Sequence, residues 1–510
     1  MISSSRHVHS AGWMAGSPGG VYLAAISAIV LVWFGILLSS SSIWVLVPAL
    51  FATACLLALL RPRLQSWLLL LFLILAWCPQ FSQVDIDAWT AAEAPTVYNY
   101  RPIPAVTASV FDYLFAGITA VWICKLLSRK SVIWRTTPFV GTMAAFFFVW
   151  LFNFLHGLAR GNETYYALRE FRNGAYFVLS YLMVVTLFSE SQATRILKII
   201  VGAAFVIGCY GVIRHELGIG REFLDHIIVF YDIADSMLLF FAMLLITAFV
   251  IERALTRWQS IVAALLTVPM ALTFLFSYRR GAWVGFAAGL FFLVLLYPGQ
   301  GRFRRAVLQR VGVSVLVVAT LLLAFPAMRN QQLEFLGQRI QSIFDTSEDS
   351  SNVFRILDAM NALYTFAHHP IIGVGAGGRY DIEYSSTEPV TMEFMEHVST
   401  TSHDGYLYVL FKSGLLGFTA YGLIFVRFLK KWLAVRTRIF NPARRAAFMA
   451  IGAMVIATLV TNITEPLSDL PRSSSLLAFI MGIGAVAMRG EMHRGQWEPA
   501  PAPGPGKATA

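Results

Sequence analysis

Three apolar runs follow one another between residues 233 and 297: IADSMLLFFAMLLITAFVI (233–251), WQSIVAALLTVPMALTFLFS (258–277) and AWVGFAAGLFFLVLLY (282–297). Each run, as a helix, is long enough to cross most or all of a bilayer core of about 30 Å. Because lipid offers no hydrogen-bond partners to free backbone groups, runs of this kind must be helical. This stretch therefore predicts a polytopic α-helical membrane protein.

The same pattern extends over the whole chain. Of its 510 residues, 57% are apolar and 13% are charged, whereas about a quarter of the residues in a soluble domain are charged. We predict about fourteen transmembrane helices, with a range of twelve to fourteen because the run at 66–82 ends raggedly at Pro79. They lie near 21–38, 43–60, 66–82, 106–127, 138–156, 174–188, 195–213, 233–251, 258–277, 282–297, 310–326, 403–428, 446–463 and 472–488.

Lysine and arginine residues orient these helices. With the N-terminus in the cytoplasm, every cytoplasmic loop carries the cations that the positive-inside rule requires. These cations lie at 61–63, 125–135, 195–198, 253–257, 302–310 and 427–445. They explain the net charge of +11 as a topology signal, so we expect no nucleic acid as a partner. Both termini are expected in the cytoplasm.

The predicted helices divide the chain into a few segments. Residues 1–20 form a cytoplasmic leader, 21–488 a single transmembrane domain, and 489–510 a cytoplasmic tail that ends in a Pro/Ala/Gly-rich, disordered sequence. Within the domain, residues 327–402 form a large loop on the outer side, too long for a simple connection. Its segment 352–368 has an amphipathic pattern, which predicts a helix in this loop.

Some cations lie on the outer side, where the topology predicts few. Arg279 and Arg280 occupy the turn SYRRGAW (277–283). They either snorkel to the outer headgroups or form an anion site, because the planar guanidinium fork suits phosphate. Arg355 lies in the amphipathic segment of the large loop. It is either a solvated charge or a further member of such a site.

His403 lies in the run TSHDGYL (401–407), which opens a long apolar helix on the outer side. A helix N-terminus disfavours added positive charge, and a neutral imidazole can accept a proton from a hydroxyl. The alternative is that Ser402 or Asp404 caps the helix and His403 is incidental.

Two further charged residues are candidates on this side. Lys412 follows within the same apolar helix, and it either pairs with an acid such as Asp112 or Glu465 or stabilises an anionic substrate. Glu465 follows the penultimate helix, and it is either a partner for an outer cation or an exposed turn acid.

The glycine-rich run HHPIIGVGAGG (368–378) is neither a P-loop nor a dinucleotide fingerprint. We interpret it as a close-packed turn that lets the large loop fold back against the helices. His368 and His369 lack the further ligands that a zinc site needs, and the four cysteines form no C-x-x-C pair. We therefore expect no metal and no cofactor.

These motifs, taken in order, resemble those of the O-antigen ligase family, whose superfamily also holds O-antigen and exopolysaccharide polymerases. The resemblance rests on SYRRGAW (277–283), Arg355, PIIGVG (370–375), HDGYL (403–407) and GLLG (414–417), and it covers roughly residues 200–470. It implies an all-helical, lipid-donor glycosyltransferase of the bacterial inner membrane. Such enzymes act in lipopolysaccharide or exopolysaccharide biosynthesis, with a periplasmic active face and without a metal.

The resemblance also implies the substrates. The donor is an undecaprenyl-diphosphate-linked glycan embedded among membrane lipids. A ligase passes the glycan to a hydroxyl on lipid A–core, and a polymerase passes it to another lipid-linked repeat. The sequence leaves these two open.

The resemblance assigns roles to individual residues. Arg280 and Arg355 match the arginines that hold the diphosphate, and His403 matches the proposed base. Glu465 is a looser match to an acidic position. The chain departs from the family in three places: Arg279 precedes Arg280 and can share its duty, Asp404 stands where Asn or Ser is common, and Lys412 stands where an acid is frequent.

A transporter of lipid-linked glycans is the rival class, since many helices with internal charges also suit a permease. Here the unusual charges gather at one face, together with the largest loop, which favours chemistry at a surface over passage through the membrane.

Overall fold

The computed structural model describes residues 139–218, 221–223, 226–229, 233–297, 350–385, 399–466 and 471–497, with isolated residues elsewhere. The chain divides into two compact units, Met1–Leu69 with Val97–Leu126 and Leu70–Thr96 with Leu127–Ala510. All elements named below belong to the second unit. The predicted helices at 21–38, 43–60, 66–82 and 310–326 lie outside the described residues or touch them at one position, and 106–127 is described only at scattered positions.

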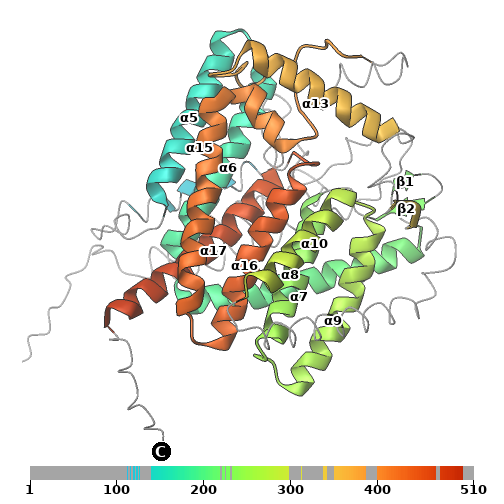
Figure 1. Ribbon diagram of the computed structural model, residues 1–510, viewed down its shortest axis with the longest axis vertical. Helices are drawn as coiled ribbons and strands as arrows, with labels where there is room; N and C mark the ends of the chain where they lie inside the picture. The colour runs from blue at the N-terminus through green and yellow to red at the C-terminus, as the bar shows by residue number, and fades with distance from the viewer. Residues whose placement is uncertain are drawn as a thin grey trace, which may run out of the picture. The chain divides into compact units, whose positions relative to one another are not determined.

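The described part is helical apart from one short ribbon. Two strands, β1 (Arg221–Phe223) and β2 (His226–Ile228), pair antiparallel. The helices, shown in Figure 1, are α5 (Val140–Ala159), α6 (Thr164–Leu187), α7 (Glu190–Glu216), α8 (Ile233–Ile251), α9 (Arg257–Phe276), α10 (Arg280–Leu295), α13 (Ser350–His368), α15 (Gly405–Val435), α16 (Pro442–Thr461) and α17 (Pro471–Trp497).

These helices confirm an all-α polytopic membrane protein. Within the described residues, seven helices are long and apolar enough to cross a membrane, and α10 is a shorter apolar helix. Each predicted run that falls largely on described residues overlaps a helix. The amphipathic segment predicted at 352–368 is α13, and α17 continues to Trp497, beyond the predicted end at 488.

The prediction for α6 was wrong at its start. The helix begins at Thr164 and not near 174, because its first turns carry polar side chains that face the interior of the bundle. Glu170 and Asn173 are both buried there. A hydropathy criterion reads these residues as loop, although tertiary contacts keep them helical.

Local sequence signals set several helix ends. At α7, Ser189 and Gln192 form a reciprocal capping box, and Thr256 and Gln259 do the same at α9. At α16, the Asn441 side chain accepts a hydrogen bond from the backbone of the first turn, directly before a proline that cannot donate one.

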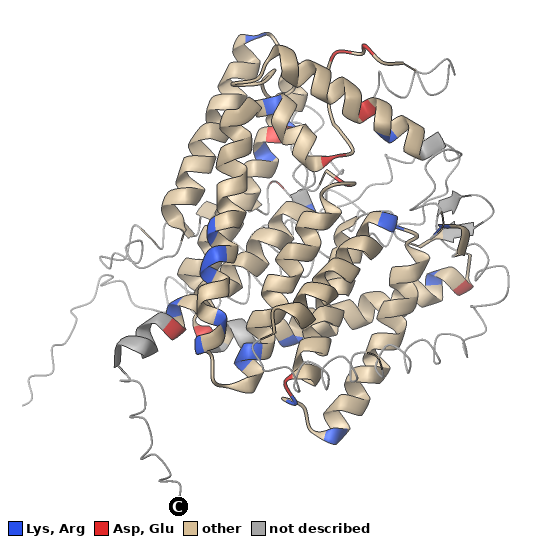
Figure 2. Ribbon diagram, viewed as in Figure 1, with Lys and Arg blue, Asp and Glu red and all other residues tan. Residues whose placement is uncertain are grey.

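Lys and Arg residues are frequent at one end of the bundle (Figure 2). Seven of them lie in residues 427–445, at the end of α15 and the start of α16. Arg445 pairs there with Glu252 at the end of α8, and Arg444 lies 3.1 Å from Glu190 at the start of α7. We call this the basic end.

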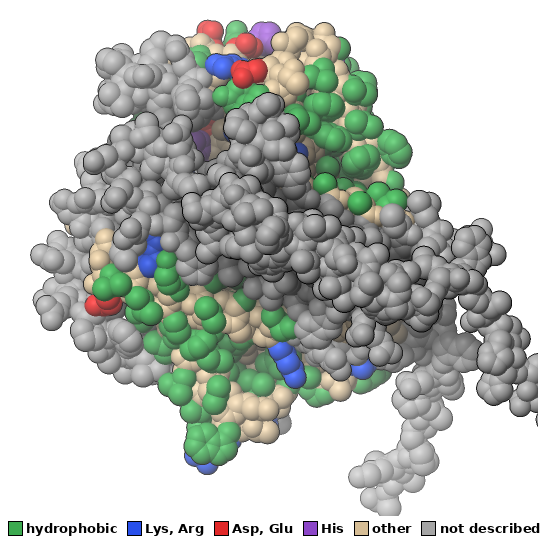
Figure 3. Space-filling view, turned by 180° about the vertical axis from the view of Figure 1, so that it is seen from behind, with side chains coloured by type: hydrophobic (Ala, Val, Ile, Leu, Met, Phe, Trp, Pro, Cys, Tyr) green, Lys and Arg blue, Asp and Glu red, His purple; other side chains and the backbone are tan. Residues whose placement is uncertain are grey.

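Large apolar side chains are exposed along the helices. Phe148, Phe152 and Leu155 of α5 are each about half exposed or more. Where described residues are visible in Figure 3, hydrophobic side chains prevail and charges are few. A surface of this kind is rare in soluble proteins and is the expected contact with lipid acyl chains.

Packing between α10 and α16 determines what lies at the opposite end of the bundle. Gly281 and Gly285, one turn apart on α10, face Thr464 and Thr461 so closely that any side chain on either glycine would collide with them. Small residues at this spacing let helix backbones approach each other in membrane proteins. This contact joins the start of α10 to the end of α16.

The long helix α15 is broken at Gly414, whose φ of 60° lies in the left-handed region that glycine tolerates. The glycine-rich turn docks into this break. The Val374 and Gly375 amides donate to the carbonyls of Phe411 and Lys412, both at 2.9 Å. The turn thus supplies hydrogen bonds that the interrupted helix lacks, and it folds the large loop back as predicted.

Candidate functional site

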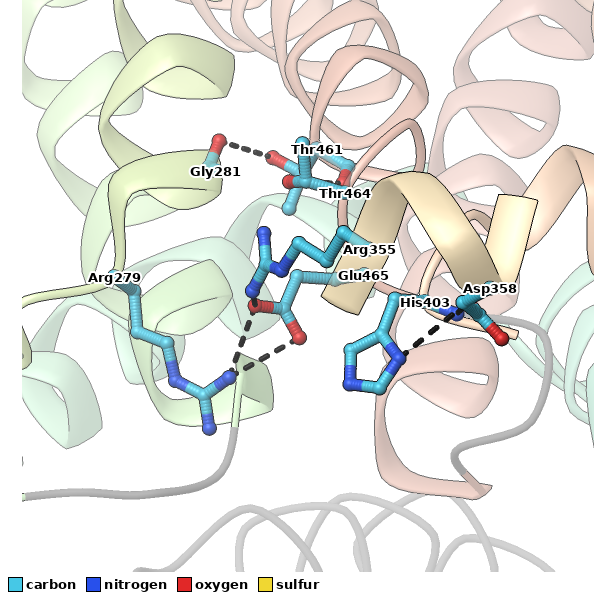
Figure 4. A network of polar contacts seen from close by, with 8 residues as sticks. All are labelled: Arg279, Gly281, Arg355, Asp358, His403, Thr461, Thr464 and Glu465. Carbon is cyan, nitrogen blue, oxygen red and sulfur yellow. Dashed lines mark hydrogen bonds and ion pairs between the residues drawn. The ribbon is translucent and has the colours of Figure 1, made fainter. Parts of the chain in front are cut away.

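Two arginines meet one carboxylate at the end of the bundle opposite the basic end (Figure 4). Arg279 Nη1 donates to both oxygens of Glu465, at 3.0 and 3.1 Å. Arg355 Nη2 lies 3.8 Å from Glu465 Oε1. The three residues come from the α9–α10 turn, from α13 and from the residues after α16. We call them the arginine cluster.

The α9–α10 turn aims Arg279 at this position. Tyr278 adopts φ 49°, an unusual value for a residue with a large side chain, and it is buried. This left-handed residue reverses the chain within the SYRR turn. Strain of this kind persists where the surrounding structure holds it, often at functional sites. Burial raises the pKa of Tyr278 to about 12, so its hydroxyl stays protonated in this turn.

Arg280 is the first residue of α10 and is half-buried. The resemblance gave it the leading role at this turn, with Arg279 sharing it. In the structure, Arg279 is the residue that pairs with Glu465. Both arginines therefore lie at this end of the bundle, and Glu465 connects Arg279 to Arg355.

His403 lies beside the arginine cluster (Figure 4). Its side chain is 30% exposed, and its ring meets Phe354 of α13 edge to face, with centroids 5.1 Å apart. Nδ1 lies 3.6 Å from Asp358 Oδ2, just beyond hydrogen-bonding distance. The imidazole thus packs against Phe354 and Asp358, two side chains of α13 that lie close to Arg355 in the sequence.

Asp404 is a helix cap. Its Oδ1 accepts hydrogen bonds from the amides of Tyr406 and Leu407, at 2.7 and 3.0 Å. Asn, Ser and Asp are all favoured at this position, so the departure from the family residue keeps the same physical role. Burial raises the pKa of Asp404, while the two amides oppose that shift.

Lys412 pairs with an acid other than the two considered from the sequence. Its Nζ lies 2.6 Å from Glu170 Oε1 and donates to the Gly378 carbonyl at 2.6 Å. The other oxygen of Glu170 accepts from the Gly377 amide at 2.9 Å. Both charged side chains are fully buried. The expected partners, Asp112 and Glu465, were wrong, because the polar start of α6 was not recognised as a helix.

Sequence reasoning missed two acids that matter here, Asp358 and Glu170. Asp358 lies three residues after Arg355, a spacing that puts both near one side of a helix, and this signal could have found it. Glu170 precedes the apolar run by which its helix was located, so no local signal pointed to it.

Tyr380 completes the surroundings of Asp358. Burial, and then the charge of Asp358, raise the pKa of its phenol, which therefore stays neutral. In the part of the chain that the structure describes, no group of three or more His, Cys, Asp and Glu side chains is arranged to hold a metal ion.

Residues 265–422 match a protein family described as O-antigen ligase. The match begins within α9 and ends within α15, so it includes Arg279, Arg280, Arg355 and His403, whereas Glu465 follows it. None of the curated proteins compared with the chain matches it. The family match confirms the resemblance drawn from the motifs.

Proposed function

Because residues 265–422 match a family described as O-antigen ligase, we propose that the protein is a glycosyltransferase that moves a glycan from an undecaprenyl-diphosphate-linked donor to a sugar hydroxyl. The observation that carries this proposal is the placement of the arginine cluster beside His403. Anion-binding groups and a candidate base thus share one end of a membrane-embedded bundle.

The arginine cluster suits a diphosphate. Two guanidinium groups share a single carboxylate, so the cluster keeps a net positive charge. Glu465 offsets the repulsion between Arg279 and Arg355 and holds them side by side before a ligand arrives. Arg355 lies 3.8 Å from the same carboxylate, and its planar guanidinium suits a phosphate. Arg280, at the positive end of α10, adds to the same field.

His403 serves as the general base. Its Nε2 takes the proton from the incoming sugar hydroxyl, and the hydroxyl oxygen forms a bond to the anomeric carbon. The bond from that carbon to the diphosphate oxygen breaks, and its electron pair leaves with the diphosphate. Arg279 and Arg355 stabilise the negative charge that develops there. In-line attack inverts the anomeric centre, and no covalent enzyme intermediate is required.

The site end faces the periplasm in this proposal, and the basic end faces the cytoplasm. The cations of residues 427–445 support this orientation through the positive-inside rule. The protein then resides in the bacterial inner membrane, where its donor carries its glycan on the outer leaflet.

Transfer from a lipid-linked donor in isolated membranes tests this function. We expect Arg355→Ala and His403→Ala each to reduce transfer about 100-fold or more, as loss of a charge-stabilising donor or a general base does. Normal transfer by the His403 variant would exclude it as the base. Absence of transfer by the unaltered protein with every lipid-linked donor would contradict the proposed function.

Surface polysaccharides of a deletion strain separate ligase from polymerase, because the family match admits both. Full-length chains that stay unattached indicate a ligase, with lipid A–core as the acceptor. Single repeats on the carrier or core indicate a polymerase. Loss of all lipid-linked glycan from the outer leaflet would indicate a transporter and would contradict both.

A further inference from the structure

Asp358 is a buried carboxylate that faces three groups of the site. Its side chain is 1% exposed. Oδ2 accepts hydrogen bonds from the His403 backbone amide at 2.7 Å and from the Ser402 hydroxyl at 3.0 Å. The same oxygen is the one nearest to His403 Nδ1, at 3.6 Å. Hydrogen-bond donors that point at a buried carboxylate offset the cost of taking it out of water.

The surroundings of this carboxylate are incomplete. Asp358 Oδ1, His403 Nδ1 and the Tyr380 hydroxyl are all buried, and none has a hydrogen-bond partner among the described residues. Buried polar atoms without partners are uncommon and need an explanation. Catalytic hydrogen bonds are often long before substrate binds and tighten in the reacting complex. The 3.6 Å gap between an acceptor and an unsatisfied ring nitrogen fits such a contact.

From this geometry we propose that Asp358 is a positioning residue for His403. It holds the proton on Nδ1, which leaves the lone pair of Nε2 to accept the proton of the acceptor hydroxyl, and it stabilises the imidazolium that forms. Phe354 confines the ring from the other side. Tyr380, kept neutral by burial and by this carboxylate, can turn its hydroxyl toward the remaining oxygen. The inference rests on the proposed function.

The arrangement also couples the two halves of the site. Asp358 and Arg355 stand one turn apart on α13. The same helix therefore carries the arginine that binds the diphosphate and the carboxylate that positions His403. Because the His403 amide and the Ser402 hydroxyl bind the same oxygen, α13 and the start of α15 are aligned by that carboxylate. A shift of α13 therefore moves donor and base together.

Asp358→Asn is the informative variant. Its amide oxygen can still accept from Ser402 and from the His403 amide, so the local fold is preserved, but the negative charge beside Nδ1 is lost. We expect kcat for transfer to fall about 100-fold, the scale of general-base catalysis, while KM for the donor stays within about threefold of the unaltered protein. Asp381→Asn is the matched control. It makes the same change at an exposed carboxylate of the same loop, so kcat should change little.

A double-mutant cycle separates positioning from a structural role. In a His403→Ala background, Asp358→Asn should cause no further fall in transfer. The inference is overturned if Asp358→Asn keeps normal kcat, or if it lowers residual transfer by the same factor whether or not His403 is present.

Chemical modification gives a readout that needs no activity. At about pH 8, where imidazoles are mostly neutral, diethyl pyrocarbonate should modify His403 several-fold more slowly in the Asp358→Asn variant, because the neighbouring charge no longer makes the ring nucleophilic. His368 and His369 of the same chain serve as internal controls and should react unchanged. If His403 is modified more slowly in the variant but the unaltered protein transfers no glycan, the proposed function is wrong and the Asp358–His403 coupling still stands. An unchanged rate would contradict the coupling itself.

Discussion

Arg279 and Arg355 illustrate how single residues of the site are held. Arg279 contacts both oxygens of Glu465, whereas Arg355 stands 3.8 Å from one of them. A carboxylate between two cations preorganises them, so less energy is spent on bringing the guanidinium groups together when the diphosphate binds. Glu465 is thus a structural partner of the cluster, and under the proposed function the diphosphate is the anion that the cluster binds.

Arg279 gives a test of recognition at the residue scale. Arg279→Lys keeps the charge but loses the planar fork that can hold a carboxylate and a phosphate together. We expect kcat/KM for the lipid-linked donor to fall about tenfold for Arg279→Lys and about 100-fold or more for Arg279→Ala.

Arg379→Ala is the control for Arg279. Arg379 is largely exposed and lies 3.9 Å from Glu163, also exposed. Such surface pairs contribute little, so transfer should be unchanged. Equal losses in the Arg279 and Arg379 variants would mean that general charge, and not a specific site, attracts the donor.

Helix α15 and the glycine-rich turn act as one unit at the scale of elements. The break at Gly414 frees backbone groups, and residues of the turn bind them. The turn is also tied to α6, because Glu170 and Lys412 bind the Gly377 amide and the Gly378 carbonyl. Since the turn follows α13 directly in the chain, these contacts help to place α13 over the start of α15.

Replacing Lys412 tests how much its ion pair with Glu170 stabilises this arrangement of α6, the turn and α15. Lys412→Ala leaves Glu170 buried without its cation, and breaking a buried ion pair in this way costs about 3–5 kcal/mol. We expect a marked fall in the thermal stability of the detergent-solubilised protein. The double variant Glu170→Gln/Lys412→Met should recover part of that stability, because it removes both charges together.

Arg444→Ala is the control for Lys412, since Arg444 pairs with Glu190 at 3.1 Å while 44% exposed. Its removal should change stability little. If Lys412→Ala kept normal stability but lost donor transfer, the alternative drawn from the sequence, that Lys412 stabilises an anionic substrate, would hold instead.

The bundle as a whole separates its charges. The arginine cluster and His403 lie at the end where α10 and α15 begin, and the cations of residues 427–445 lie where α15 ends and α16 begins. Between them, the helices expose apolar side chains. This separation favours an enzyme that works at one membrane surface over a transporter that needs polar groups along a path.

Cysteine accessibility in spheroplasts tests this orientation. Ile371 and Phe440 are 70% and 82% exposed, near the site end and the basic end respectively. We expect a membrane-impermeant maleimide to label Ile371→Cys in intact spheroplasts and Phe440→Cys only after the membrane is opened. Because the chain has four cysteines of its own, the experiment uses a variant without them. The reverse labelling pattern would contradict a periplasmic site.

Much of this protein could be predicted from the sequence alone. Apolar runs require helices in lipid, whatever they pack against. Cations outside their expected loops marked Arg279, Arg280, Arg355 and Lys412 as candidates, and its place at the start of a helix marked His403. The glycine-rich turn was also readable as a close-packed segment. These features depend on local composition and on the solvent around the chain, so no tertiary contact is needed to infer them.

Only the tertiary structure decided which side chains face each other. Arg279 and Glu465 are separated by 186 residues, His403 and Asp358 by 45, and Lys412 and Glu170 by 242. Such pairs form because helices approach closely at particular points, as α10 does on α16 where its glycines meet threonines. That approach depends on the shapes of two distant segments at once, and no pattern within either segment records it.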